Sequence, residues 1–156
     1  VETTVNATID KVWQFWTDPK HIVKWNNASD DWHTPAAEND LRVGGKFSSR
    51  MEAKDGSMGF DFWGIYTTIE PLQFIGFTLG DKRKVEIRFL AEGNKTRIVE
   101  TFDPENVNSL ELQQTGWQAI LNNFRKFAET YNSMEKLHFE ISIHASASKV
   151  FGTTLS

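Results

Sequence analysis

The longest amphipathic segment of the chain, residues 109–131 (SLELQQTGWQAILNNFRKFAETY), most limits what the chain can fold into. From Trp117 to Tyr131 its apolar residues stand one or three positions apart, which places them along one face of an α-helix. At about 1.5 Å per residue, this predicted helix is about 34 Å long. A helix of that length with one aromatic face needs a broad apolar surface to pack on, and predicted strands in the middle of the chain supply it.

Aromatic residues make up 13% of the 156 residues, with twelve Phe and six Trp. Large rings fill hydrophobic cores, and they also line ligand cavities. A net charge of −4 without any basic run argues against nucleic acid as a partner. The chain has no cysteine, which excludes a disulfide framework and a thiolate metal site and fits a reducing compartment. Because no apolar run approaches the roughly 20 residues that cross a bilayer, and no signal-peptide pattern occurs, we expect a cytoplasmic protein without a membrane partner.

The elements predicted before the long helix begin with a short strand over residues 1–6 and two short helices. Residues 7–16 place their apolar side chains on one helical face, and residues 20–25 form the second short helix. Residues 26–40 are rich in polar side chains and are predicted to be a loop. An antiparallel meander of five strands follows, at residues 46–54, 58–69, 74–79, 84–89 and 96–102.

Glycines and prolines mark the turns of this meander. Gly44 and Gly45 predict a bulge or a close backbone approach at a bend, and Asp55-Gly56 predicts a hairpin. Hairpin-length connections require antiparallel pairing. The order of elements therefore predicts an α+β fold, in which a twisted antiparallel sheet lies against one long C-terminal helix.

Three motifs resemble the START-like (SRPBCC, helix-grip) superfamily. They are residues 12–19 (VWQFWTDP), residues 40–47 (DLRVGGKF) and the pair Gly116-Trp117 inside the last helix. Within the superfamily, the chain looks most similar to the family named after the activator of the heat-shock-protein-90 ATPase, over about residues 1–131. The resemblance implies a curved antiparallel β-sheet wrapped around the C-terminal helix, with two short helices after the first strand and a cavity between sheet and helix. Because the superfamily includes lipid carriers, receptors, cyclases and chaperone co-factors, the resemblance selects no single activity.

The end of the chain looks like a second copy of its beginning. Residues 139–151 align with residues 1–13 at a constant offset of 138, with four identities. We therefore divide the chain into a helix-grip domain, residues 1–132, and a repeat-like segment, residues 133–156. Two interpretations stay open: this segment begins a second domain, or it adds an edge strand to the same fold, including one swapped onto a partner chain in a homodimer.

The sequence offers little polar chemistry. Its four histidines are scattered and form no ligand pair, so no metal site and no cofactor is predicted. Nucleotide-binding glycine loops and a nucleophile-elbow serine are both absent. Asp61 lies among aromatic residues, but we expect it to pair outward with Arg50 or Arg88 rather than to catalyse a reaction.

The remaining chemistry is hydrophobic, and the aromatic residues either meet as a solid core or surround a cavity. The cavity interpretation predicts a non-catalytic protein that binds a small apolar molecule between the sheet and the long helix. The predicted lining is Trp32, His33, Phe47, Met51, Met58, Phe60, Trp63, Phe77, Trp117 and Leu121.

Two alternatives are kept from the resemblance. One is a chaperone co-factor or other protein-interaction domain, which needs an exposed patch such as Trp25 and Trp32 with Asp30-Asp31. The other is a cyclase-like or hydrolase-like enzyme, which needs two convergent ionisable groups inside a cavity.

Overall fold

A computed structural model describes residues 1–150, with side chains through residue 143. Within that range the chain forms one sheet and three helices. Their order is β1 (Glu2–Val5), α1 (Ile9–Thr17), α2 (Pro19–Trp25), β2 (Trp32–Asn39), β3 (Lys46–Ala53), β4 (Gly59–Glu70), β5 (Phe74–Leu79), β6 (Lys84–Glu92), β7 (Lys95–Phe102) and α3 (Leu110–Val150).

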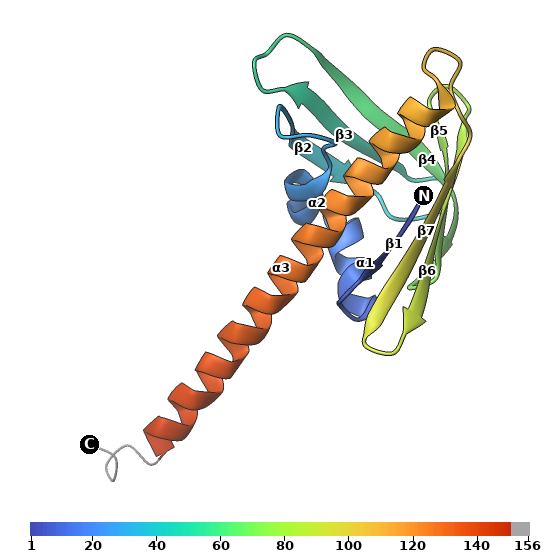
Figure 1. The fold of residues 1–156 in the computed structure, drawn as a ribbon. Helices are drawn as coiled ribbons and strands as arrows, with labels where there is room; N and C mark the ends of the chain where they lie inside the picture. The colour runs from blue at the N-terminus through green and yellow to red at the C-terminus, as the bar shows by residue number, and fades with distance from the viewer. Residues whose placement is uncertain (151–156) are drawn as a thin grey trace.

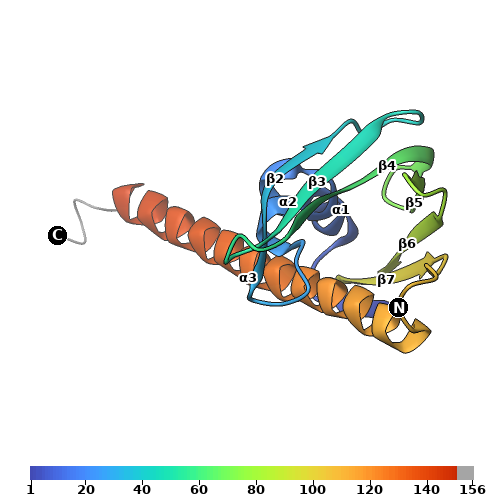
Figure 2. The same ribbon diagram turned by 90° about the horizontal axis from the view of Figure 1, so that it is seen from above.

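The seven strands form one antiparallel sheet in the order β1-β7-β6-β5-β4-β3-β2. The sheet curls, and α3 runs across its concave side, while α1 and α2 lie between the sheet and α3 (Figures 1 and 2). The short first strand pairs with β7 because the chain returns to it after the meander. The predicted α+β helix-grip fold is confirmed, including the two short helices after the first strand.

Strand β2 corrects the expectation that residues 26–40 form a loop. Trp32–Asn39 pairs with β3 at the edge of the sheet. Pro35 lies where the register shifts between His33 and Ala36. An edge strand tolerates a proline at such an irregularity, because its N–H groups on one side need no sheet partner. The polar composition of the segment reflects this exposed edge position.

The bend between β2 and β3 requires glycine. Gly44 adopts a φ of 83°, and a Cβ atom on Gly45 would lie 2.1 Å from the carbonyl oxygen of Asp40. Gly44 also donates a hydrogen bond to the Tyr66 carbonyl of β4, at 2.8 Å. The close backbone approach predicted at this glycine pair is therefore confirmed, and it brings the start of β3 onto β4.

The solid core lies where α1 and α2 meet the middle of α3. Phe15, Leu121, Phe124 and Ala128 are completely buried there. Trp25 is also buried, and its indole Nε1 donates a hydrogen bond to the Phe15 carbonyl at 3.0 Å. The exposed patch suggested for protein interaction is therefore wrong at Trp25, because this ring belongs to the core.

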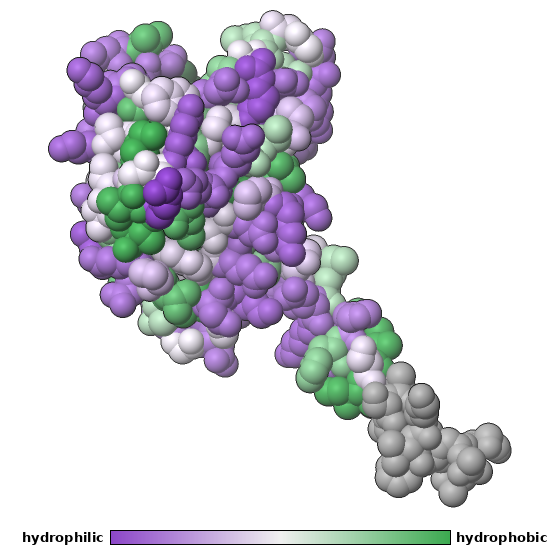
Figure 3. All heavy atoms as spheres, turned by 180° about the vertical axis from the view of Figure 1, so that it is seen from behind, coloured by the Kyte–Doolittle hydropathy of each residue, from purple (hydrophilic) through white to green (hydrophobic). Residues whose placement is uncertain are grey.

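Helix α3 is longer than predicted. It spans 41 residues rather than ending at Tyr131, and its C-terminal part projects from the body (Figures 1 and 3). Residues 139–143 continue this helix and do not form a strand, whereas residues 151–156 lie outside the described part of the chain. The assignment of residues 133–156 to a second copy or a swapped element stays a prediction. The exposed apolar side chains of the projecting part are Met134, Leu137, Phe139, Ile141 and Ile143. Within the described residues, no helix has the length and apolar content needed to cross a membrane.

A histidine is buried between the helices. His21 of α2 packs against the rings of Phe15, Phe127 and Tyr131, with centroids 4.9 to 5.6 Å apart. Its Nδ1 has no hydrogen-bond partner among the described residues. Burial lowers the pKa of this imidazole, and Asp18 acts in the opposite direction. Folding therefore favours the neutral form of His21 over its charged form.

This burial predicts a specific loss of stability in acid. Because the pKa of His21 is lower in the folded state, the unfolded chain takes up a proton first as the pH falls below about 6.5. The free energy of unfolding should decrease below that pH, and His21→Leu should reduce the decrease. Urea denaturation across the pH range measures this, with exposed His33→Gln as the matched control. An unchanged pH dependence in His21→Leu would contradict the assignment.

Candidate functional site

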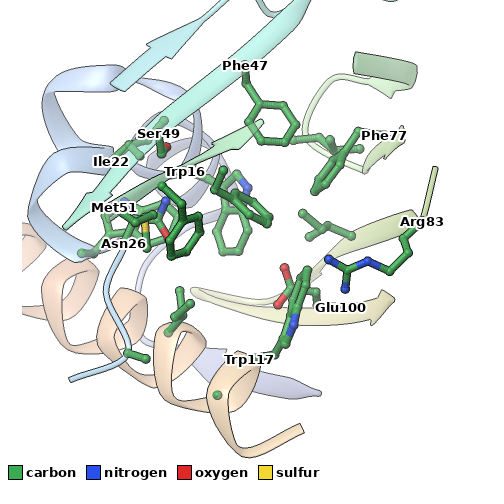
Figure 4. A pocket seen from close by; sticks show the side chains of 18 of the residues that line it. Trp16, Ile22, Asn26, Phe47, Ser49, Met51, Phe77, Arg83, Glu100 and Trp117 are labelled. Atoms are coloured by element: carbon green, nitrogen blue, oxygen red, sulfur yellow. The ribbon is translucent and has the colours of Figure 1, made fainter. Parts of the chain in front are cut away.

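A cavity of about 390 Å³ lies between the N-terminal half of α3 and the concave face of the sheet (Figure 4). Side chains from α1, α2, α3 and strands β2 to β7 line it. Its lining includes the exposed residues Ala28, Phe60 and Asn108, which mark where it reaches the surface. Helix α3 therefore borders a cavity near its N-terminal end, at Trp117, and packs into a solid core further along, at Leu121 and Phe124.

The helix wall of the cavity comes from one face of α3. Gln113, Gly116, Trp117 and Ile120 line the space, at the i, i+3, i+4 and i+7 positions that share a helical face. A Cβ atom on Gly116 would have no neighbour within 4 Å. This glycine therefore leaves open space and does not serve a close approach to the sheet. One turn further along, Leu121 and Phe124 turn into the core.

The sheet wall is a cluster of aromatic rings. Phe47 of β3 contacts Phe62, Tyr66 and Phe77, with ring centroids 4.7 to 5.9 Å apart. The Tyr66 hydroxyl donates a hydrogen bond to Asn39 Oδ1 at 2.5 Å, and burial raises the pKa of this phenol. The rings hold one another in place, so this wall keeps its shape without a ligand.

Trp117 connects the two walls. Its ring stacks on Phe102 of β7 with a centroid distance of 4.2 Å and an interplanar angle of 10°. Its edge approaches Phe62 of β4, at 6.2 Å. Trp117 is only half-buried because the rest of its surface faces the cavity.

A carboxyl group lies in this apolar space. Glu100 of β7 is 7% exposed and lines the cavity, next to the inward-facing Phe102 on the same strand face. Its carboxyl oxygens receive no hydrogen bond within the described residues. Burial raises the pKa of Glu100 to about 8, partly offset by the amino group of Val1. Figure 4 shows this carboxyl among the apolar lining residues, on the side of the cavity where Trp117 and Arg83 are labelled.

Three other ionisable residues line the cavity, namely Glu38, Arg83 and Glu105. The Arg83 Nε donates a hydrogen bond to Asp81 Oδ2 at 2.6 Å. The Glu105 carboxylate accepts the backbone N–H groups of Asn108 and Val107, at 2.7 and 3.0 Å. These hydrogen bonds lower the pKa of Glu105. Unlike Glu100, Arg83 and Glu105 thus have hydrogen-bond partners in the protein.

Half of the predicted lining residues surround the cavity, namely Phe47, Met51, Phe60, Phe77 and Trp117. Strand parity explains one that does not. On β4, Phe60, Phe62 and Tyr66 share the inner face, so Trp63 points outward under Lys46, whose Nζ is 4.7 Å from the ring centroid. The prediction placed Phe60 and Trp63 in one cavity although their positions differ by an odd number.

The other four predicted residues lie elsewhere for separate reasons. Met58 is exposed in the turn before β4, and Leu121 is fully buried in the core. His33 is exposed on β2, with Nε2 3.8 Å from Glu52 Oε2. Trp32 is half-buried at the edge of the sheet, and its ring centroid lies 5.9 Å from that of Phe60. Their binding role therefore has no support from the geometry.

Sequence reasoning missed Glu100, Phe62 and Tyr66. The signal for Glu100 was present, because Thr96, Ile98, Glu100 and Phe102 alternate along β7 and their apolar members face inward. A carboxyl at such a position is a candidate site residue, since burial disfavours its charged form. The expected outward pairing of Asp61 is confirmed, as its Oδ1 lies 3.5 Å from Arg50 Nη1.

The site suits binding and proton exchange. Among the described residues, no three His, Asp or Glu side chains lie close enough together to hold a metal ion. The apolar rings exclude water and provide surface for an apolar molecule. Glu100 can donate a hydrogen bond when protonated and can accept one, or pair with a cation, when ionised.

Comparison with known proteins places this geometry in a family. The model of proteins described as "Activator of Hsp90 ATPase homolog 1-like protein" matches residues 6–129. A protein of Cytophaga hutchinsonii with a solution structure is 55% identical, over 86% of this chain and 92% of that one, with a TM-score of 0.73. The AHSA1-like protein of Aeromonas hydrophila is 42% identical, over 85% and 93%, with a TM-score of 0.79. No significant match was found among curated proteins.

Because α3 is packed at Phe124 and borders the cavity at Trp117, replacing these two side chains by alanine should reduce the free energy of unfolding by different amounts. Phe124→Ala removes a fully buried ring that contacts Trp16 and Trp25, so it should reduce the free energy of unfolding by about 3–5 kcal/mol. Trp117→Ala should reduce it by less, because part of its ring faces open space. Chemical denaturation of both variants checks this. An equal or larger loss for Trp117→Ala would mean that this end of the helix is packed as core.

The raised pKa of Glu100 predicts that the free energy of unfolding changes with pH in the direction opposite to the change caused by His21. Its pKa is raised from 4.5 to about 8, so between these values the folded protein holds a proton that the unfolded chain has released. Its stabilising contribution is present below pH 4.5 and is lost as the pH rises toward about 8. Glu100→Gln should therefore gain stability relative to wild type on going from about pH 5 to about pH 8, by more than about 1 kcal/mol. Urea denaturation tests this, with exposed Glu86→Gln as control, and a constant difference would contradict it.

Proposed function

This chain belongs to the family of activator of Hsp90 ATPase homolog 1-like proteins, and we propose that it binds an apolar small molecule without covalent chemistry. The resemblance stated from its sequence is thereby confirmed at the level of the family. The observation that carries the proposal is the cavity of about 390 Å³ between α3 and the sheet. Its volume lies within the range of about 300–1,000 Å³ typical of small-molecule sites.

The composition of the lining supports an apolar ligand. Apolar side chains from both walls, many of them aromatic, make up most of the lining, and polar residues such as Asn26, Ser49 and Gln113 lie among them. Packed protein interiors leave few voids larger than a water molecule, since each void forfeits contacts between apolar atoms. A ligand that fills this cavity restores those contacts and stabilises the folded state by mass action.

The enzymatic alternative has one observation in its favour. Glu100 and Arg83 are two ionisable groups that line the same cavity, although the Arg83 guanidinium is hydrogen-bonded to Asp81. Recovery of a bound molecule unchanged supports binding alone. Chemical conversion that is lost in Glu100→Gln supports catalysis.

The patch suggested for the protein-interaction alternative does not include Trp25, which is buried, whereas Trp32 is half-buried and Asp30-Asp31 is exposed. The name of the family concerns a chaperone activator, and that activity is not carried over to this chain by the family match alone.

Filling the cavity from Gly116 tests the proposed function. N-phenylnaphthylamine is a neutral, apolar dye whose fluorescence rises when it leaves water. Wild type should bind it, and Gly116→Leu should weaken binding at least about tenfold, because the new side chain occupies the space that a Cβ atom finds open. Gly116→Ala should keep most of the binding and raise stability by about 0.5–1 kcal/mol, because alanine favours the helix.

The matched control is Thr115→Leu, which adds the same side chain one position away on the exposed side of α3. It should leave dye binding unchanged. Equal binding by wild type and Gly116→Leu would contradict a ligand site in this cavity.

A further inference from the structure

The charges around the cavity are strongly unequal. Its ionisable lining residues are three carboxylic acids, Glu38, Glu100 and Glu105, and one cation, Arg83. Arg83 is paired with Asp81, at 2.6 Å. The titratable side chains of the lining are therefore mostly acidic, and low-dielectric walls strengthen the attraction between an acid that ionises there and a cation that enters.

Glu100 differs from the other acids by its position and its contacts. Glu38 is exposed, and Glu105 is held by two backbone N–H groups. Glu100 is more than nine-tenths buried, faces the cavity, and has no hydrogen-bond partner for its carboxyl oxygens within the described residues. Its carboxyl group is therefore open to the cavity, where a ligand can supply the partner that the protein does not.

We propose that the ligand carries a basic nitrogen on its apolar body, and that the ammonium group pairs with the Glu100 carboxylate beside the Trp117 ring. This inference rests on the proposed function, because it names the class of molecule that the same cavity binds. The apolar body would occupy the space between Ile120 and the rings of β3 to β5, where the lining is aromatic.

Three physical effects favour a cation over other ligands. A carboxylate in a low-dielectric site binds an ammonium ion through a charge-assisted hydrogen bond, which is stronger than a bond between neutral groups. The face of a tryptophan ring attracts a cation electrostatically. A ligand carboxylate would instead lie near three acids, and the guanidinium that could receive it is already paired.

A matched set of probes isolates the charge of the ligand. Tryptamine, tryptophol and indoleacetic acid share one indole body and differ in an ammonium, a hydroxyl and a carboxylate. In displacement of N-phenylnaphthylamine from wild type, tryptamine should act at a concentration at least about tenfold lower than tryptophol. Indoleacetic acid should be the weakest. This comparison uses the unaltered protein and needs no variant to fold.

Glu100→Gln then identifies the recognising group. It keeps the shape of the side chain and removes its charge, so the ratio of the displacing concentrations of tryptophol and tryptamine should fall to about one. Glu92→Gln, an exposed change on the neighbouring β6, should keep the full preference.

The outcomes separate this inference from the proposed function. Equal binding of the amine and the alcohol, stronger binding of the acid, or failure of all three to displace a bound dye would overturn the cationic ligand and leave the cavity site standing. A preference that survives in Glu100→Gln would overturn the role of Glu100. Failure of the dye itself to bind wild type would overturn the proposed function.

Discussion

The packing of α3 across the concave side of the sheet holds the rest of the structure in place. One face of this helix packs into the core along part of its length and borders the cavity along another part. Around Leu121, Phe124 and Ala128 it is sealed by α1 and α2, and these side chains are completely buried. Around Gly116 and Trp117 the same face borders the cavity instead. The packed residues fix the position of the helix, so the part around Gly116 and Trp117 can remain beside an open space.

This division explains how a small domain can keep a cavity. Stability in a packed interior comes from buried apolar area, which the contacts among α1, α2 and α3 provide. The aromatic rings of the sheet wall and the stack of Trp117 on Phe102 then give the open half fixed sides. Glu100 faces the space between these walls, where burial disfavours the charged form of its carboxyl group. Sites that bind or react often retain such a locally unfavourable group, because function rather than stability requires it.

Much of the fold could be predicted from periodicity alone. The apolar face of α3 and the alternation in β3 to β7 each repeat several times, so single irregular residues do not hide them. Strand β2 could not be found in that way, because Pro35 interrupts it and an edge position leaves its side chains polar. The extension of α3 beyond Tyr131 was also missed, because Phe139, Ile141 and Ile143 alternate as in a strand and align with the predicted first strand of the chain. Among the site residues, strand parity was sufficient to reject Trp63 and to select Phe62 and Glu100. The position of Leu121 in the core and Trp117 at the cavity required knowledge of where α1 and α2 end.

The central claim is that the space beside Trp117 receives an apolar ligand, and the position of a bound molecule tests it most directly. Protein with labelled isoleucine, leucine and methionine methyl groups can be titrated with N-phenylnaphthylamine and followed by NMR. Our account predicts contacts between the dye and the methyl groups of Met51, Ile75, Ile87 and Ile120, which line the cavity, and none with Leu121. Contacts confined to the exposed methyl groups of Met134 and Leu137 on the projecting part of α3 would contradict it.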